Sequence, residues 1–296
     1  SIITVSYFDK SALDVTLEAI FKSTTKYSYE VIVVNNASPD GSMDMVRQKY
    51  YSNPNYQPKL KLIDNKTNLG FGKGNNIGMK VAKGDYILLL NSDTKVDEDN
   101  FEVMLDFIKT RPDIGIVTCK LLKPDGTLDA ASRRSEPDPK ISFYRLSGLQ
   151  RLFPNKFGSY NLLNSDINQE SQLDACVGAY MLMSRKAYEV TQGFDEDFFM
   201  YGEDLDLCKR VRDAGLKIWY YPNSSCIHFK GQSSKRTPQK MIYYFHFTMW
   251  LYYKKHYQSK YNILMDFFVY VGIWGRFIVK SILNLLRPKH KRFVSK

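Results

Sequence analysis

The sequence contains few cysteines and no long uninterrupted apolar run. Four cysteines occur among its 296 residues (Cys119, Cys176, Cys208 and Cys226), and none are spaced as C-x-x-C. This argues against a metal cluster or a disulfide framework and favours a reducing cytosol. The apolar stretch from Asn262 to Arg287 is interrupted by charges at 266, 276 and 280. It therefore lacks the clean run of about 20 apolar residues that a membrane span needs.

Acidic residues are almost absent from the C-terminal part of the chain. From Lys230 to Lys296 there are fourteen Lys or Arg residues and one acid, Asp266. The first 229 residues carry 28 basic and 30 acidic residues. A near-neutral body with a strongly basic tail indicates that the tail meets an anionic surface, either anionic lipid or nucleic acid.

Short apolar runs of β type alternate with helix-like stretches through the first two-thirds of the chain. This alternation predicts an α/β fold with a mostly parallel sheet and helices on both faces. The predicted strands are Ile2–Val5, Val31–Val34, Leu60–Ile63, Tyr86–Leu90, Ile114–Cys119, Cys176–Ser184 and Lys217–Tyr221. The predicted helices are Ser11–Ser23, Gly41–Tyr50, Gly74–Ala82, Asp99–Lys109 and Glu203–Ala214. The segment from Pro124 to Gln172 is polar and supports no assignment.

Polar residues follow the ends of three predicted strands, where α/β sheets bind their ligands. They are Ser6-Tyr7, Asn35-Asn36 and Asn91-Ser92-Asp93. A carboxylate at the tip of a buried strand can hold a divalent cation on a diphosphate, because Mg²⁺ takes one or two carboxylates plus phosphate oxygens. A turn with helix-capping residues is the alternative interpretation of Asn91-Ser92-Asp93.

Three further features carry candidate chemistry. The segment from Gly70 to Asn75 is rich in glycine but lacks the G-x-G-x-x-G spacing, although such a loop can still let backbone approach a diphosphate. Glu203 and Asp204 begin a predicted helix, where one could take a proton from a hydroxyl; simple helix capping is the alternative. His228 is a packed residue or a metal ligand, and imidazole suits Mn²⁺ better than Mg²⁺.

These stretches resemble the family 2 glycosyltransferases of the GT-A fold, and within them the bacterial rhamnosyltransferase-like branch. The matching segments are VIVVNNASPDGS, NLGFGKGNNIGMKVAKGDYILLLNSDT, GAYMLMSRKAYEVTQGFDEDFFMYGEDLDLCKRVRDAG and IHFKGQS. They cover most of residues 1–234 in the family's order. The resemblance implies a GT-A nucleotide-diphospho-sugar transferase domain over 1–234, with a nucleotide-binding half (1–95) and an acceptor half (96–234).

The resemblance also implies roles for individual residues. Asn91-Ser92-Asp93 stands at the family's D-x-D motif, so Asp93 is expected to hold Mn²⁺ or Mg²⁺, with His228 as a second ligand. Asp204 matches the catalytic base, and Glu203 supports it. The expected substrate-binding residues are Ser6, Tyr7, Asp9, Asn35, Asn36, Gly70, Lys73, Asn75, Asn91, Ser92, Gly178 and Ala179. Two of these depart from the family, since Asn91 replaces the first Asp of D-x-D and Asn35-Asn36 replaces a base-binding Asp.

The implied reaction is a single in-line displacement that inverts the sugar. The branch resemblance favours a dTDP-rhamnose donor, with UDP-linked hexoses and galactofuranose as alternatives. The expected acceptor is a lipid-linked saccharide of a surface polysaccharide pathway. A nucleic-acid-binding protein that uses the basic tail, and a sugar-nucleotide-binding scaffold without activity, are the competing hypotheses.

The tail predicts peripheral attachment to the cytoplasmic face of a membrane. In a helix over 262–287, one polar stripe falls within an arc of about 80°, and the remaining circumference is mainly apolar. The stripe consists of Asn262, Asp266, Arg276, Lys280, Asn284 and Arg287. That is the pattern of a helix lying in a membrane interface, with its polar stripe toward water. Aromatic residues between Met241 and Tyr257 and a basic cluster after Arg287 suit the headgroup region. We therefore expect a membrane-association region over 235–296; packing on the body or on a second copy in a homodimer is the alternative.

Overall fold

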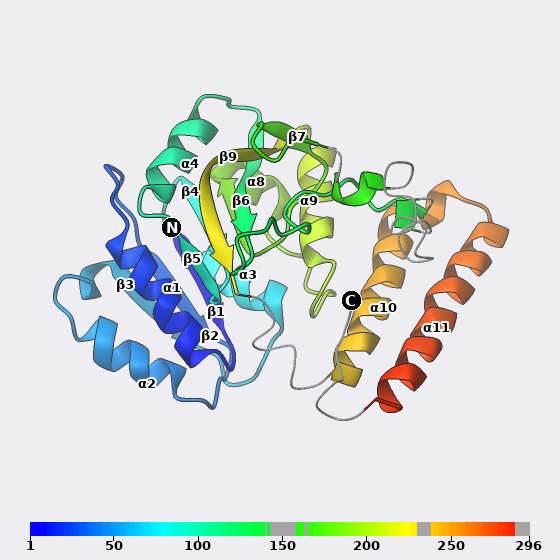
Figure 1. Ribbon diagram of the computed structural model, residues 1–296, viewed down its shortest axis with the longest axis horizontal. Helices are drawn as coiled ribbons and strands as arrows, with labels where there is room; N and C mark the ends of the chain where they lie inside the picture. The colour runs from blue at the N-terminus through cyan, green and yellow to red at the C-terminus, as the bar shows by residue number, and fades with distance from the viewer. Residues whose placement is uncertain (140, 143–157, 163–164, 230–237, 288–296) are drawn as a thin grey trace.

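A nine-stranded sheet forms the centre of the molecule (Figure 1). The computed structural model describes residues 1–139, 141–142, 158–162, 165–229 and 238–287. The strand order is β3-β2-β1-β4-β8-β6-β9-β5, and β7 pairs with β9. The strands are β1 (Ile2–Ser6), β2 (Val31–Asn35), β3 (Leu60–Asp64), β4 (Tyr86–Leu90), β5 (Thr94–Val96), β6 (Ile114–Leu122), β7 (Ser171–Leu173), β8 (Tyr180–Ser184) and β9 (Lys217–His228).

The N-terminal strands form a parallel sheet whose carboxyl ends align. β1 pairs parallel with β2 and β4, and β2 pairs parallel with β3. The register places Ser6 beside Asn35, and Asn35 beside Asp64. β8 then joins antiparallel to β4 and β6, and β9 runs parallel to β6. The α/β class is confirmed, and the register brings polar strand ends from distant parts of the sequence to one edge.

Helices cover both faces of this sheet, as the alternation predicts. Alternate residues of β2 enter different cores, with Val31 and Val33 on one face and Ile32 and Val34 on the other. The first face packs on α1 (Lys10–Lys22), α2 (Ser42–Val46) and α4 (Asn100–Lys109), and the second on α3 (Phe71–Val81), α8 (Arg185–Thr191) and α9 (Glu203–Asp213). Short helical turns occupy Arg47–Tyr51 (a π-helix), Gln57–Lys59, Gly158–Asn161 and Gln258–Lys260.

Several boundaries differ from the sequence prediction. The helix predicted over Gly41–Tyr50 is divided between α2 and the following π-helical turn. β9 continues to His228 instead of ending at Tyr221, because its second half pairs with β5. This extension places His228 directly beside Thr94, one residue after the predicted metal ligand Asp93. Pairing with a distant three-residue strand has no local sequence signal, so the prediction missed it.

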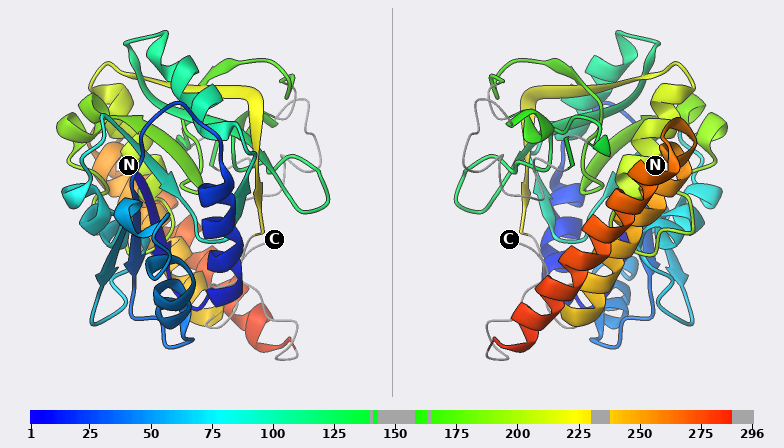
Figure 2. Two further views of the ribbon diagram at one scale, coloured as in Figure 1. Left: turned by 90° about the vertical axis from the view of Figure 1, so that its left-hand side faces the viewer. Right: turned by 90° about the vertical axis from the view of Figure 1, so that its right-hand side faces the viewer.

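The C-terminal helices α10 (Pro238–His256) and α11 (Ile263–Leu285) form an antiparallel pair at one end of the molecule. The second view of Figure 2 shows α11 on the outer side of α10. α10 packs on the segment that leads into α9, and the Tyr244 ring stacks on Phe199 at 4.7 Å between centroids. Tyr252, Tyr253 and Tyr257 are buried with Phe198. Their burial leaves these rings unavailable for stacking on nucleic-acid bases.

The polar stripe of α11 faces α10, which corrects the predicted orientation toward water. Asp266 accepts a hydrogen bond from the Tyr253 hydroxyl (2.6 Å), and Arg276 donates to His246 (3.0 Å). Asn284, which is 3% exposed, lies 3.4 Å from Gln239. The apolar circumference is left on the outside. Within the described ranges, no helix is long and apolar enough to cross a membrane.

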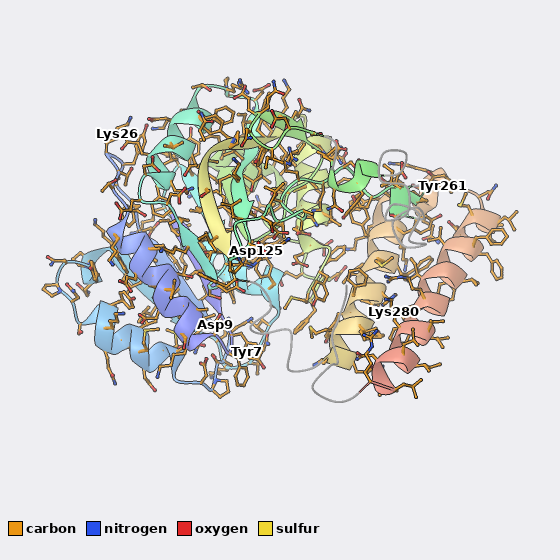
Figure 3. The ribbon with its side chains drawn as sticks, viewed as in Figure 1. Tyr7, Asp9, Lys26, Asp125, Tyr261 and Lys280 are labelled. Carbon is orange, nitrogen blue, oxygen red and sulfur yellow. The ribbon has the colours of Figure 1, made fainter. Side chains whose placement is uncertain are left out.

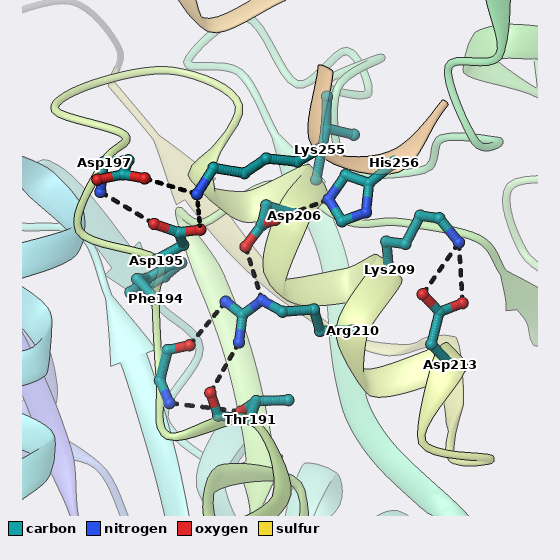
Figure 4. A network of polar contacts seen from close by, with 12 residues as sticks. Thr191, Phe194, Asp195, Asp197, Asp206, Lys209, Arg210, Asp213, Lys255 and His256 are labelled. Atoms are coloured by element: carbon teal, nitrogen blue, oxygen red, sulfur yellow. Dashed lines mark hydrogen bonds and ion pairs between the residues drawn. The ribbon is translucent and has the colours of Figure 1, made fainter. Parts of the chain in front are cut away.

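A buried carboxylate joins α10 to α9 (Figure 4). Asp206 is 1% exposed; its Oδ2 lies 2.7 Å from Arg210 Nε, and its Oδ1 lies 2.8 Å from His256 Nε2. Arg210 also donates to the backbone oxygens of Thr191 (2.7 Å) and Gly193 (2.8 Å). Asp206 and Arg210 together therefore link the C-terminal helices, α9 and the end of α8.

Removing this carboxylate should destabilise the fold. Asp206→Ala leaves Arg210 and His256 without their shared partner, so we expect the free energy of unfolding to fall by about 3–5 kcal/mol. Asp213→Ala is the matched control on the same helix, because its ion pair with Lys209 is more than half exposed on the Asp213 side and should contribute about 1 kcal/mol or less. Urea denaturation measures the free energy of unfolding of both variants. Equal losses of stability would contradict the role given to Asp206.

Candidate active site

A buried carboxylate joins the ends of the first and fourth strands. Asp9 is 6% exposed, and its oxygens accept hydrogen bonds from the hydroxyls of Ser6 (2.5 Å) and Ser92. Burial raises the pKa of Asp9, and the two hydroxyls oppose that rise. The backbone amide of Tyr7, the residue after Ser6, also donates to Asp9 (3.3 Å). The structure thus brings together four of the residues predicted to bind substrate, of which Tyr7 and Asp9 are labelled in Figure 3.

A pocket of about 410 Å³ opens beside this cluster. Its lining includes Asp9, Lys10 and Asp40, together with Phe8 and Phe229. The pocket thus combines charged groups with two aromatic rings at the carboxyl edge of the parallel strands. This is the position at which α/β sheets bind nucleotides.

Asn35 and Asn36 organise the loops next to the pocket. Asn35 donates from Nδ2 to Asp64 (2.9 Å) and accepts from the Ser38 amide (2.9 Å). Asn36 is 2% exposed and donates to the backbone oxygen of Gly70 (2.9 Å). These two side chains are therefore engaged in holding the 37–38 and 64–70 loops at the pocket edge.

The glycine-rich segment approaches the loop before α9. Gly70 has a φ of +85°, and a Cβ built on it would lie 2.3 Å from the backbone oxygen of Phe199, so only glycine fits there. Lys73 pairs with Glu196 (3.3 Å), and Asn75 donates to the backbone oxygen of Phe71 (3.0 Å). The start of α3 is thereby bound to the 194–202 segment.

Asp93 and His228 lie together, although 135 positions separate them in the sequence. His228 Nε2 is 3.3 Å from Asp93 Oδ1, and Nδ1 is 3.4 Å from Asp129 Oδ2. Burial alone would lower the pKa of His228, but these two carboxylates outweigh it and raise the pKa to about 9. The imidazole is therefore protonated at pH 7, and metal binding would displace that proton.

The donor set at this place fits a divalent cation that is also bound by phosphate oxygens. Asp93 and His228 supply two ligands, and the buried Oδ1 of Asn91 has no hydrogen-bond partner among the residues that the structure describes. Asp129 fixes the second ring nitrogen of His228, as carboxylates commonly do behind histidine ligands. No cluster of three or more His, Cys, Asp or Glu ligands occurs in the part of the chain that the structure describes. A cation here would thus need oxygens from a bound diphosphate to complete its coordination.

The dipeptide Gly178-Ala179 connects this place to the acidic start of α9. The backbone oxygen of Ala179 accepts from the Asn91 amide (3.0 Å), and the Gly178 amide donates to Asp204 Oδ2 (3.2 Å). A Cβ on Gly178 would stand 3.0 Å from the Phe71 ring. Adjacent residues therefore contact Asp204 and the strand end that carries Asp93.

Asp204 forms a buried ion pair with Arg134. The carboxylate is 7% exposed, and its Oδ2 lies 2.7 Å from Arg134 Nη2. Its Oδ1 accepts from the Leu205 amide (2.8 Å). With the Gly178 amide, three of roughly four acceptor positions on this carboxylate are used. Among the residues that the structure describes, no donor occupies the remaining position on Oδ1, which can accept a hydroxyl hydrogen.

Glu203 stays protonated beside Asp204. Burial, followed by the negative charge of Asp204, raises the pKa of Glu203 from 4.5 to about 8. Its Oε2 is buried without a hydrogen-bond partner among the described residues. Arg134 forms its ion pair with Asp204 and not with Glu203, so the two neighbouring carboxyl groups differ in their charged partners among the described residues.

Sequence reasoning missed Arg134 and Asp129. Both lie in the polar segment from 124 to 172, for which the pattern supports no assignment. Arg134 is held by a backbone bridge to Ala175 (2.9 Å in both directions) and is 8% exposed. The only local signal is the pair Arg133-Arg134, and adjacent arginines are ordinarily exposed.

Comparison with known proteins now identifies the family. The family model described as "Glycosyl transferase family 2" matches residues 1–190. The chain belongs to glycosyl transferase family 2. A second model, described as the "N-terminal domain of galactosyltransferase", matches residues 160–232. The protein is thus a glycosyltransferase, as its motifs predict.

Two relatives of this glycosyltransferase are rhamnosyltransferases. The N-acetylglucosaminyl-diphospho-decaprenol L-rhamnosyltransferase of Mycobacterium tuberculosis is 24% identical over 282 residues, covering 90% of this chain and 83% of that protein. Rhamnosyltransferase WbbL of Escherichia coli is 28% identical over 167 residues, covering 54% of this chain and 61% of WbbL. The resemblance to the rhamnosyltransferase-like branch is confirmed.

Solved structures confirm the GT-A fold. The mannosyltransferase PcManGT of Pyrobaculum calidifontis, solved with GDP-Man and Mn²⁺, gives a TM-score of 0.60 at 16% identity, covering 96% of this chain and 69% of that chain. TarS of S. aureus, solved with UDP-GlcNAc, gives 0.57 at 17% identity, covering 96% and 73%.

The raised pKa of Glu203 makes the stability of this glycosyltransferase depend on pH. The folded protein keeps the Glu203 proton up to about pH 8, whereas the unfolded chain releases it near pH 4.5. The contribution of this group is complete below pH 4.5 and is lost as the pH rises to about 8. Glu203→Gln has no such proton, so its melting temperature should rise relative to wild type between pH 5 and pH 8.5.

Differential scanning calorimetry at the two pH values measures this difference. Glu189→Gln, at an exposed position of α8, is the control and should follow wild type at both. An effect of Glu203→Gln that is the same at pH 5 and pH 8.5 would show that Glu203 is already ionised in the folded state.

Proposed function

We propose that this glycosyltransferase transfers rhamnose, with inversion, from dTDP-rhamnose to a lipid-linked saccharide in surface polysaccharide synthesis. The arrangement of Asp204 carries the proposal. It is a buried, ion-paired carboxylate with one free acceptor position, and Gly178-Ala179 connects it to the Asp93–His228 pair. The names of the two rhamnosyltransferase relatives, one with a diphospho-decaprenol acceptor, support the sugar and the acceptor class.

Asp204 is the base in this mechanism. Its free Oδ1 position accepts the proton of the acceptor hydroxyl while the hydroxyl oxygen attacks the anomeric carbon. The bond from that carbon to the diphosphate oxygen breaks with its electron pair, and the nucleoside diphosphate leaves from the opposite side. Arg134 orients Asp204 through their ion pair, so it acts as a positioning residue. The protonated Glu203 supports the base by adding no second negative charge.

The donor occupies the carboxyl edge of the parallel strands. The nucleoside lies in the pocket beside Asp9, and the diphosphate lies toward Asp93. The residues proposed to contact the donor or line its cleft are Ser6, Tyr7, Asp9, Asn35, Asn36, Gly70, Lys73, Asn75, Asn91, Ser92, Gly178 and Ala179. Asn35 and Asn36 act through the loops that they hold.

Asp93 and His228 are the proposed ligands of a divalent cation, Mn²⁺ or Mg²⁺. When bound, the cation supplies positive charge to the diphosphate. Asp129 orients His228 from behind. Mn²⁺ in the structures of PcManGT and of GalNAc-T7 supports this choice.

The proposed domain division follows from these proposed residue roles. Residues 1–95 form the nucleotide-binding half and 96–234 the acceptor half of one catalytic domain, and 235–296 form the membrane-association region. Residues 230–237 and 288–296 lie outside the described residues. The basic cluster predicted after Arg287 falls within the second of these segments.

A donor panel combined with a base variant tests the function. Binding of dTDP-rhamnose, UDP-hexoses and UDP-galactofuranose is measured with Mn²⁺, Mg²⁺ or chelator, followed by transfer to a polyprenyl-diphosphate-linked N-acetylglucosamine. We expect selective, metal-dependent binding of dTDP-rhamnose. Asp204→Asn should keep donor affinity and lower kcat by roughly 100- to 10,000-fold, because the proton loses its acceptor.

Other outcomes would redirect the proposal. Turnover retained by Asp204→Asn would remove Asp204 as the base. Selective binding of a UDP-sugar would change the donor and leave the base in place. Donor binding without transfer by the wild-type protein would favour the inactive scaffold.

The outer face of α11 supports peripheral membrane attachment at the cytoplasmic face. Its apolar side chains are exposed to an extent that is unusual for a water-facing helix. They are Ile263 (86% exposed), Leu264 (60%), Phe267 (59%), Phe268 (61%), Val271 (48%), Ile278 (55%), Val279 (56%), Ile282 (52%) and Leu285 (54%). Because the polar stripe faces α10, the apolar face can enter the lipid interface without burying charge.

Charges on this face should release the protein from membranes. Phe268→Glu combined with Val279→Glu removes two apolar contacts and places carboxylates against lipid, so we expect vesicle binding to fall at least about tenfold. Val190→Glu, on α8 and 51% exposed, is the matched control and should bind as wild type does. Sedimentation with phosphatidylglycerol vesicles measures the bound fraction.

The same variants test whether a second copy of the chain, and not lipid, covers the outer face of α11. If sedimentation with vesicles is unchanged while analytical ultracentrifugation shows a dimer dissociating to a monomer, α11 is a homodimer surface. Unchanged sedimentation alone would refute membrane contact through this face.

A further inference from the structure

The inward side of α11 carries two cations one helical turn apart. Arg276 and Lys280 both lie on the side that faces α10, where Lys280 is labelled in Figure 3. Like charges at this spacing destabilise a helix by roughly 0.2–0.5 kcal/mol. The only acid between positions 240 and 287 is Asp266, more than two turns away and bonded to Tyr253. Lys280 forms no ion pair with any residue in the described ranges.

His246 on α10 orients the first of these cations without adding charge. Its Nδ1 lies 2.7 Å from the backbone oxygen of Ile242, so this nitrogen carries the hydrogen. Its Nε2 is then the acceptor for Arg276 Nη1 at 3.0 Å. Burial, with the charges of Arg276 and Lys280, lowers the pKa of His246, which keeps the ring neutral. Burial and the neighbouring arginines also lower the pKa of Lys280, as expected where cations accumulate.

These cations lie close to the loop that begins the catalytic helix. The guanidinium of Arg276 is 5.9 Å from the centroid of the Phe245 ring. The Phe245 ring packs edge-on against Tyr201 at 5.8 Å between centroids. Gly202 and Glu203 follow Tyr201 directly, and a Cβ on Gly202 would lie 3.5 Å from Thr248 of α10. A pair of aromatic rings thus separates the cations from the start of α9.

Three parts of the molecule are therefore available to a ligand. They are the apolar outer face of α11, the cationic inner side of α11, and the carboxylate of Asp204. A lipid that carries a saccharide on a diphosphate has the complementary order of parts, namely hydrocarbon, anion and sugar hydroxyls. Arginine binds phosphate oxygens in a fork, and lysine binds them as a point charge.

We propose that Arg276 and Lys280 bind the diphosphate of the lipid-linked acceptor, with its hydrocarbon against the outer face of α11. The inference rests on the proposed function, since it assigns a binding site to that acceptor. It makes the α10–α11 pair an acceptor-binding element in addition to a membrane contact. A phospholipid headgroup shares the phosphate chemistry, so the test compares the two.

The experiment measures binding of the full chain to three kinds of vesicle. These are phosphatidylcholine alone, phosphatidylcholine with undecaprenyl diphosphate, and phosphatidylcholine with phosphatidylglycerol at matched charge. We expect wild type to prefer the undecaprenyl diphosphate vesicles over both others. Arg276→Gln with Lys280→Gln should lose that preference by at least about tenfold, since the variant removes the charge-assisted hydrogen bonds to the diphosphate.

Lys254→Gln with Lys260→Gln is the matched control, because it removes the same charge from exposed positions in the last turn of α10 and just after it. It should retain the preference. Arg276→Lys keeps the charge and should bind the undecaprenyl diphosphate vesicles at an intermediate level. If circular dichroism shows that the double variant does not fold, Arg276→Lys replaces it in the test. An equal loss on phosphatidylglycerol vesicles would assign these cations to general membrane charge and overturn the proposal.

Failure here is distinguishable from failure of the proposed function, because vesicle binding needs neither donor nor transfer. If undecaprenyl diphosphate gives no preference while metal-dependent donor binding and transfer persist, only the acceptor site is wrong. In the transfer assay, the double variant should raise the acceptor KM at least about tenfold and leave the donor KM unchanged. A fall in kcat alone, with both KM values unchanged, would also overturn the assignment.

Discussion

The buried carboxylates at the start of α9 impose the constraint on which the rest of the structure depends. Asp204 and Asp206 are each 7% exposed or less, and a carboxylate in such a position requires a charged or hydrogen-bonding partner. Arg134 reaches Asp204 from the polar segment before β7, and Arg210 and His256 reach Asp206. The first pairing shapes the site, and the second attaches the C-terminal helices. The proposed catalytic base and the residue that attaches the C-terminal helices therefore both lie in the first turn of α9.

This constraint also explains why two adjacent carboxyl groups differ. The guanidinium of Arg134 pairs with Asp204, while Glu203 is buried without a cation and keeps its proton. Glycine at 70 and at 178 allows Phe199 and the Phe71 ring, respectively, to approach the backbone closely.

The C-terminal helices invert the usual arrangement of a surface helix. α11 turns its polar residues toward α10 and its apolar residues outward. Such an arrangement is costly in water, because a large apolar area remains hydrated. Lipid on the outer face would remove that cost. The Phe199–Tyr244 and Tyr201–Phe245 contacts connect α10 to the loop before α9.

The sequence by itself determined the fold class and the mostly parallel sheet, and it singled out the candidate acidic and metal-ligating residues. These follow from local periodicity and from motifs at strand ends, which depend on neighbouring residues only. It also determined that α11 is amphipathic, but not which side faces outward, because that depends on the partner helix. Tertiary structure alone decided the partners of the buried groups, such as Arg134 for Asp204 and Asp129 for His228. Electrostatic pairing joins residues 70 and 99 positions apart, and a polar segment carries no periodic signal of which arginine will be buried.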